Sequence, residues 1–494
     1  MKKQEKLLAL LLLFLMLPCF ILPVSANSAQ KEWAGRDESG VMATDGDCPL
    51  VVEHETLTFD IQDFPNYRNY DNEELSSYTG RVSAEYTFYN PSDMTVTVQM
   101  AFPLGDTFQT YAGSYGDYII KVNGENIDSE MRHTLTSYSD DFDIEKDLPR
   151  LLDGYYTDSF FTGEDMQVSE YTITIPDFEG GEYWGGPRCG IDINPADYPN
   201  TVFYIPYMDQ YHVLDDGTYR TYGNRVRPGN QITYYVIGEQ PKYLPSFKVY
   251  NDWHCLDDQV LANGVNTLKT GTLTLGELIF ENYDESRGIS RIDWYNANLE
   301  LLRVRRENGN PIGRLSDFSS WGTEMLMTWY CYEVTVGPGE RITNEVSSPI
   351  YPGVSTLYDP PIYKYTYLLS PAGTWADFGG LDIYINTPYY VTDSSLDGFK
   401  KTENGYELHL DGLPREKIRE ITLGGIKETE GEILELEFTV STSEKPVHES
   451  QTPSGIIKNI TYFLLFFGPI ILIGVAAIAV LIILILIFKR IFRH

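Results

Sequence analysis

The clearest strand signal in the chain is the stretch Arg81-Val-Ser-Ala-Glu-Tyr-Thr-Phe-Tyr-Asn-Pro-Ser-Asp-Met-Thr-Val-Thr-Val-Gln-Met-Ala-Phe102. Hydrophobic side chains recur at every second position in both of its halves, which is the period of a strand that buries one face. The halves are separated by Asn90-Pro-Ser-Asp93, whose residue types favour a turn. We therefore expect two strands joined as a β-hairpin over a hydrophobic core.

Alternation of the same kind recurs along the rest of the chain. It predicts further strands at 50–61, 167–175, 201–207, 230–238, 328–336 and 433–440, and it places on shared faces Tyr363, Tyr365 and Tyr367 and, separately, Leu381, Ile383 and Ile385. Asn123-Gly124 and Asn404-Gly405 are dipeptides that favour tight hairpin turns. The chain is therefore expected to be mostly β-strand.

One segment has helical spacing instead. Ser290 can cap a helix whose hydrophobic positions are Ile292, Tyr295, Leu299 and Leu302. A chain of 494 residues is also too long for one ordinary core, so more than one domain is expected. The predicted fold class is mainly β, with two β-sandwich-like domains, a small mixed α/β insert and one C-terminal transmembrane helix.

These predictions divide the chain into eight segments. They are a signal peptide at 1–26, a flexible lead-in at 27–47, an N-terminal β-sandwich domain at 48–245, a mixed linker or insert with a short helix at 246–324, a C-terminal β-sandwich domain at 325–440, a stalk at 441–458, a transmembrane helix at 459–488 and a basic cytoplasmic tail at 489–494. The stalk is rich in Ser, Glu and Pro, which suits a linker.

Two resemblances can be stated from these residues. Tyr86-Thr-Phe-Tyr-Asn90, Phe102-Pro-Leu104 and Ile120-Lys-Val-Asn-Gly124 resemble the VIT domain of vault and inter-alpha-trypsin inhibitor proteins, over residues 50–130. The resemblance implies a β-sandwich. Since no von Willebrand A domain and no Asp-x-Ser-x-Ser signature follow, it implies no adhesion function. Tyr367-Leu-Leu-Ser-Pro371 with Leu381-Asp-Ile-Tyr-Ile385 resembles bacterial exported proteins that have one C-terminal anchor, which implies no activity.

The C-terminal segment predicts the anchor. No charged residue occurs from Asn459 to Phe488, and about 20 apolar residues are enough for a helix to cross a bilayer. Lys489, Arg490 and Arg493 follow at once, which predicts that the tail is cytoplasmic. The segment predicts one membrane pass, with the lipid bilayer as a partner.

The N-terminal segment has the three parts of a secretory signal peptide. A basic start is followed by an apolar run from Leu7 to Pro23 and by Val24-Ser25-Ala26, which predicts cleavage after Ala26. An uncleaved second anchor is the alternative. Cleavage would give a single-pass type I protein with its N-terminal ectodomain outside the cell.

Charge excludes one class of partner. The formal net charge is −34, and because both ends are basic the exported part is more acidic still. Such a charge repels nucleic acid and leaves weak calcium uptake open. The four cysteines of the exported part, Cys48, Cys189, Cys255 and Cys331, permit two disulfides in three pairings, and the sequence does not choose among them.

Candidate site residues are few. Asp192, Asn194 and Asp197 are the candidate oxygen ligands for calcium, although no complete calcium loop is present. Tyr183, Trp184, Tyr198 and Tyr211 could form an aromatic platform for a glycan, and packing of a Tyr-rich core is the other interpretation.

No catalytic residue is predicted. Adjacent strand residues such as His254 and Cys255 point to opposite faces, so they cannot form a nucleophile–base pair by themselves. We expect a membrane-anchored, non-catalytic protein with a surface-binding or structural role. The alternative is an anchored hydrolase of envelope polysaccharide, which would need two carboxylates facing each other in a cleft.

Overall fold

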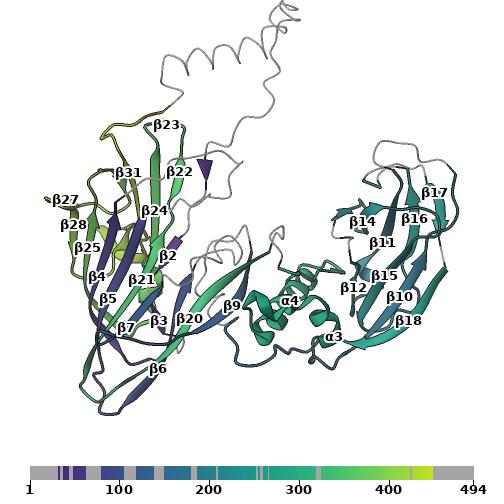
Figure 1. The fold of residues 1–494 in the computed structure, drawn as a ribbon, viewed down its shortest axis with the longest axis horizontal. Helices are drawn as coiled ribbons and strands as arrows, with labels where there is room; N and C mark the ends of the chain where they lie inside the picture. Colours follow the sequence, from purple (N-terminus) through teal and green to yellow (C-terminus); the bar gives the residue numbers. More distant parts are fainter. Residues whose placement is uncertain are drawn as a thin grey trace, which may run out of the picture.

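The computed structural model describes residues 32–33, 37–39, 41–43, 48–62, 79–104, 118–137, 150–179, 186–206, 208, 210–251, 254–255, 260–264, 266–318, 324–422 and 425–448. In these residues the chain is mainly β, with several sheets and two α-helices (Figure 1). The expected mainly β class is therefore confirmed.

The first group of strands forms what we call the large β body. Its eight-stranded sheet has the order β27 (Lys400–Lys401), β28 (Gly405–Leu410), β25 (Asp377–Asn386), β4 (Val51–Ile61), β5 (Gly80–Tyr89), β21 (Arg341–Ile350), β7 (Ile119–Val122) and β8 (Glu125–Asn126). A six-stranded sheet has the order β1 (Glu32–Trp33), β22 (Gly353–Ser355), β24 (Ile362–Leu368), β31 (Leu436–Ser441) and β26 (Tyr390–Ser394), with β2 (Asp37–Ser39) paired to β24. A four-stranded sheet has the order β3 (Met42–Ala43), β6 (Val96–Leu104), β20 (Glu324–Val336) and β9 (Glu130–Ser137).

One hydrophobic core joins these three sheets. Phe59 of the eight-stranded sheet packs edge-on against Phe438 of the six-stranded sheet, with ring centroids 5.0 Å apart. Val98 and Tyr332 bring the four-stranded sheet into the same core. The predicted faces of β24 and β25 are confirmed, because the tyrosines of the first and the aliphatic residues of the second are buried there.

A second group of strands forms what we call the small β body. One five-stranded sheet has the order β18 (Asn266–Thr274), β10 (Gln167–Thr174), β15 (Gln231–Gly238), β12 (Thr201–Tyr204) and β19 (Ile312–Gly313). The other has the order β13 (Gln210–Val213), β14 (Tyr219–Arg225), β11 (Arg188–Ile193), β16 (Ser246–Tyr250) and β17 (Val260–Gly264). Phe203 and Val236 of the first sheet share a core with Ile191 and Val249 of the second. Two separate two-stranded sheets pair β23 (Tyr358–Asp359) with β32 (Val447–His448) and β29 (Arg415–Thr422) with β30 (Gly425–Ile433).

A helical layer connects the two bodies. Helices α3 (Leu275–Ile279) and α4 (Arg291–Glu307) lie between the bodies in Figure 1. Trp294 and Leu299 of α4 share a core with Val202 of the small body and Leu135 of the large body. The predicted helix is confirmed, because the Ser290 hydroxyl accepts a hydrogen bond from the Asp293 amide at 3.1 Å and caps α4.

The predicted hairpin at 81–102 is wrong, although both strands exist. β5 pairs with β4 and β21 in the eight-stranded sheet, whereas β6 pairs with β20 in the four-stranded sheet. The turn between them is an arch that crosses the core. The buried side chain of Asn90 holds this arch in place. Its amide donates hydrogen bonds to the Val336 and Gly337 carbonyls at 3.0 and 3.1 Å, which connects the arch to the turn after β20. The hairpin at Asn123-Gly124 is confirmed by the pairing of β7 with β8.

The predicted division into sandwiches at 48–245 and 325–440 does not match the strand pairing. β4 lies between β5 and β25, so the two predicted domains share one sheet, and the small body is inserted between β9 and β20. The segment 246–324 is also no linker, because β16 to β18 belong to the sheets of the small body. Alternation predicts that a strand exists, but it does not name the strand's neighbour.

Several predicted segments at the ends of the chain have a different outcome. The lead-in at 27–47 contributes β1 to β3, and the stalk at 441–458 contributes β32, so both take part in sheets. The signal peptide at 1–26, the helix at 459–488 and the tail at 489–494 lie outside the described residues. Within the described part of the chain, no helix has the length and hydrophobicity needed to cross a membrane.

Candidate functional site

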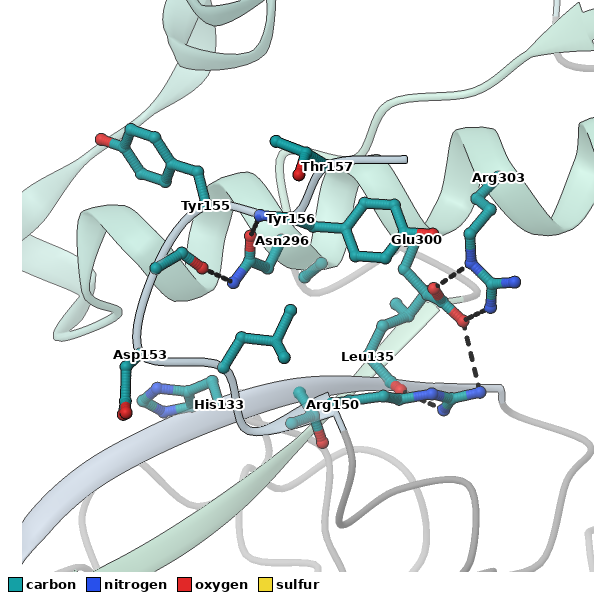
Figure 2. A pocket seen from close by; sticks show the side chains of 14 residues that line it. His133, Leu135, Arg150, Asp153, Tyr155, Tyr156, Thr157, Asn296, Glu300 and Arg303 are labelled. Atoms are coloured by element: carbon teal, nitrogen blue, oxygen red, sulfur yellow. Dashed lines mark hydrogen bonds and ion pairs between the residues drawn. The ribbon is translucent and has the colours of Figure 1, made fainter. Parts of the chain in front are cut away.

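A pocket of 710 Å³ lies where α4 faces β9 (Figure 2). β9 is the outermost strand of the four-stranded sheet, and α4 approaches it from the small body. The segment 152–157 forms the third wall. The cavity is within the usual size range of small-molecule sites.

A buried ion pair holds the first two walls together. The carboxylate of Asp293 on α4 accepts hydrogen bonds from Arg132 Nε at 3.1 Å and from the His133 amide at 2.9 Å, both on β9. The side chains of Arg132 and Asp293 are 12% and 3% exposed. Since a buried charge is costly without its partner, this pair fixes the distance between helix and strand.

The floor of the pocket is polar but uncharged. The His133 side chain is fully buried, and burial lowers its pKa to about 4, so the imidazole is neutral at physiological pH. Beside it, the Thr134 hydroxyl accepts a hydrogen bond from Trp329 Nε1 at 2.8 Å. A buried tryptophan of the neighbouring strand therefore positions the floor.

Asn296 fixes the third wall to the helix. Its side-chain oxygen accepts a hydrogen bond from the Tyr156 amide at 2.7 Å, and its nitrogen donates to the Gly154 carbonyl at 2.9 Å. Tyr155 packs against Tyr295 of α4 with ring centroids 4.7 Å apart. In Figure 2 the Leu135 side chain lies between the helix and the strand. The pocket thus has a wall that is anchored at two points.

At the other end of the pocket, two arginines share one carboxylate. Arg303 donates to Glu300 from Nε at 2.8 Å and from Nη2 at 2.6 Å, and Arg150 Nη2 lies 3.3 Å from the same carboxylate (Figure 2). Arg150 also donates to the Leu135 carbonyl of β9 at 2.9 Å. We call Arg150, Glu300 and Arg303 the arginine bridge. It links α4 to β9 and supplies the pocket with charged hydrogen-bond donors.

Two of the three predicted calcium ligands have protein partners. Asp192 accepts hydrogen bonds from Arg220 Nε at 2.6 Å and lies 3.4 Å from Lys248 Nζ. The Asn194 side chain caps the 3-10 helix Pro195–Asp197 by accepting from the Ala196 amide at 3.0 Å, and Asp197 is exposed. Among the described residues no group of three or more His, Cys, Asp and Glu side chains is arranged to hold a metal ion.

The predicted aromatic platform is only partly within the described residues. Tyr183 and Trp184 lie outside them. Tyr198 packs edge-on against Phe203 at 4.9 Å, as part of the small body's core, while Tyr211 is 38% exposed and packs against Tyr219. Tyr198 therefore follows the core-packing interpretation.

The predicted cysteines are all buried. Burial raises the pKa of the Cys189 and Cys331 thiols to about 12. Cys189 faces the core of the small body, while Cys255 belongs to a separate cluster with Tyr222 and Tyr250. His254 is exposed, whereas Cys255 is buried.

The sequence did not predict this pocket. Arg132 and Asp293 are 161 positions apart, and neither lies in a recognisable motif. One signal was available, because the segment after Ser290 was expected to be helical and carries Asn296, Glu300 and Arg303 at spacings of four and three, which place them on one face.

Comparison with solved structures finds likenesses, of which one is described here. A crystal structure described as a "putative nutrient binding protein" from Legionella pneumophila has a TM-score of 0.31 and 9% sequence identity to this chain, over 83% of this chain and 72% of that chain. A likeness at this TM-score carries no argument. No protein-family model and no curated protein matches the chain. The resemblance to the VIT domain stays a prediction from the sequence.

Proposed function

We propose that this chain is a non-catalytic binding protein, and that its ligand is a small polar molecule held in the pocket between β9 and α4. The observation that supports this function is the construction of the pocket. Its walls are fixed by the buried Arg132–Asp293 pair and by Asn296, and its lining combines tyrosine rings with guanidinium groups. Pre-formed cavities with a few oriented polar groups are typical of binding sites.

The proposal includes the place where binding occurs. The signal at 1–26 and the apolar segment at 459–488 predict a single-pass protein whose β bodies, proposed as sandwich domains, face the outside of the cell. Mass spectrometry of the mature N-terminus tests cleavage after Ala26. Protease treatment of intact cells tests the orientation, because an external ectodomain would be released.

The alternative, hydrolysis of envelope polysaccharide, has less support. It requires two carboxylates on opposite sides of a glycosidic bond. Two carboxylates line the pocket: Glu300 is engaged by two arginines, and Asp153 is fully exposed. In Figure 2 Asp153 lies at the far end of the pocket from Glu300 and points away from it. This arrangement does not place two acids around one substrate atom.

The proposed function is tested by ligand screening with a blocked variant. Thr157 lines the pocket and is exposed, so a tryptophan there would add bulk to the pocket lining without displacing the core. The full chain and Thr157→Trp are compared by thermal unfolding against a panel of monosaccharides, amino acids and organic acids. A ligand of the folded state raises the unfolding midpoint.

We expect ligands that stabilise the wild type to have no effect on Thr157→Trp. The matched control is Thr402→Trp, at an exposed turn of the large body, which should respond as the wild type does. If Thr157→Trp keeps every stabilisation seen in the wild type, the pocket is not the binding site.

A further inference from the structure

The arginine bridge contains more positive than negative charge on the pocket side. Glu300 is one carboxylate between the guanidinium groups of Arg150 and Arg303. Glu307 also bonds Arg303 at 2.7 Å, but it is 54% exposed and does not line the pocket. Because exposed pairs are screened by water, Glu307 offsets little of the charge that faces the cavity.

Arg303 has hydrogen-bonding capacity left over. A guanidinium group has five N–H donors. Within the described residues Arg303 uses three of them, on Nε and Nη2 to Glu300 and on Nη1 to Glu307. Two N–H groups therefore lack a protein acceptor in this part of the chain, and the Arg303 side chain is only 25% exposed. A carboxylate is the acceptor whose geometry best fits a guanidinium.

The rest of the lining carries no further cation or buried acid. His133 is neutral, and Leu135, Tyr156 and Asn296 offer apolar faces and uncharged polar groups. A ligand that fits these walls has one anionic group and an uncharged body.

We propose that the pocket is selective for small organic acids, whose carboxylate is held by Arg303 and Arg150. This inference rests on the proposed function. Glu300 holds the two guanidinium groups in position while the pocket is empty, and it competes with the ligand carboxylate for them. The bridge attracts an anion locally, whereas the net charge of −34 repels anions from the rest of the surface.

The test uses pairs of probes that differ at one group. The full chain is titrated with D-glucuronate and D-glucose, with benzoate and benzamide, and with succinamate and succinamide, in buffer of constant ionic strength. Binding is measured by calorimetry and by the shift of the thermal unfolding midpoint. We expect at least one acid to bind about tenfold more tightly than its neutral partner, since hydrogen bonds to charged groups discriminate by this amount or more.

Three variants assign that preference to the bridge. Arg303→Gln should remove the preference for the acid and leave the neutral partner unchanged. Glu300→Gln keeps the shape of the side chain but removes the carboxylate that competes with the ligand for the two arginines. It should therefore tighten acid binding several-fold. Glu307→Gln is the matched control, because it removes the other acidic partner of Arg303 outside the pocket.

The outcomes separate this inference from the proposed function. If a neutral probe binds as tightly as its acid, and Thr157→Trp abolishes both, then the pocket binds ligands but the selectivity for acids is wrong. If Glu300→Gln weakens acid binding, the competing role of Glu300 is wrong. If no probe and no member of the wider panel binds to the wild type or to Glu300→Gln, the proposed function itself fails. The wild-type preference stands as a test even where a variant does not fold.

Discussion

Glu55 provides the sharpest test of the structure, because a carboxyl group is buried in the core of the large body. It lies on β4 opposite Tyr86 of β5 and is 1% exposed. Its Oε1 accepts a hydrogen bond from the Tyr367 hydroxyl at 3.3 Å, while Oε2 has no hydrogen-bond partner among the described residues. Burial raises the pKa of Glu55 to about 7, and hydrogen bonds from Tyr86 and Tyr367 oppose this rise.

The raised pKa has a definite sign for stability. The folded state holds the proton more tightly than the unfolded state, whose pKa is near 4.5. The contribution of Glu55 is therefore fully present below pH 4.5 and is lost as the pH rises toward 7. At about 1.4 kcal/mol per pH unit, the loss over this window is ~3 kcal/mol.

Replacing Glu55 by Gln removes this loss, because the amide has nearly the same shape and does not ionise. Its buried N–H groups cost about 1–3 kcal/mol if they find no acceptor, but that cost is the same at every pH. We therefore expect the difference in the free energy of unfolding, Glu55→Gln minus wild type, to increase by ~3 kcal/mol from pH 4.5 to pH 8.

The assay is urea unfolding at a series of pH values, followed by tryptophan fluorescence. Glu53→Gln is the matched control on the same strand. Glu53 binds Arg341 at the surface, and the hydrogen bond from Arg341 lowers the pKa of Glu53, so its small effect has the opposite sign. Parallel curves for wild type and Glu55→Gln across this pH range would refute the reasoning.

Three further predictions concern the walls of the pocket. Asp293→Asn leaves Arg132 as an uncompensated buried charge and should destabilise the chain by about 3–5 kcal/mol in urea unfolding. The control Asp153→Asn, at an exposed position, should have no effect. Equal effects of the two variants would contradict the buried pair. Ser290→Ala removes the cap of α4 and should lower the free energy of unfolding by about 1 kcal/mol. Because α4 forms one wall of the pocket, the variant should also bind the pocket ligand more weakly; an unchanged affinity would mean that the cap acts only on the end of the helix. His133 has a pKa of about 4 in the folded state against 6.5 ordinarily, so its contribution is full above pH 6.5 and is lost as the pH falls toward 4; His133→Gln should reduce this acid loss, and an unchanged pH profile would count against a buried neutral imidazole.

The sequence predicted local elements well and their neighbours poorly. Ser290 and the hydrophobic spacing after it located α4, because a cap and a helical period are both local properties. The partners of β5 and β6 were wrong, because the arch at Asn90 is fixed by bonds to carbonyls 246 and 247 positions away. No local pattern encodes such distant partners.

Glu55 shows what could still have been read from the pattern. It shares the buried face of β4 with Leu57, Phe59 and Ile61, so its phase in the alternation already placed a carboxyl group in the core. The pocket is different. Arg150, Glu300 and Arg303 are ordinary surface residues in the sequence, and their shared site follows only from the packing of α4 on β9.

Glu55 and His133 together predict more than either group does alone. Between pH 4.5 and 6.5, rising pH removes the stability that Glu55 contributes and restores the stability that His133 contributes, because each group binds protons differently in the folded and unfolded states. Their effects are of similar size, because the pKa of Glu55 rises from 4.5 to about 7 and the pKa of His133 falls from 6.5 to about 4. Glu55 lies between facing sheets and His133 lies between β9 and α4, so their contributions should add. These two groups should therefore nearly cancel in the wild type, while Glu55→Gln and His133→Gln should give slopes of opposite sign relative to it. The double variant should return to the wild-type slope; a double variant that follows one single variant would mean that only one of the two groups is buried as the structure has it.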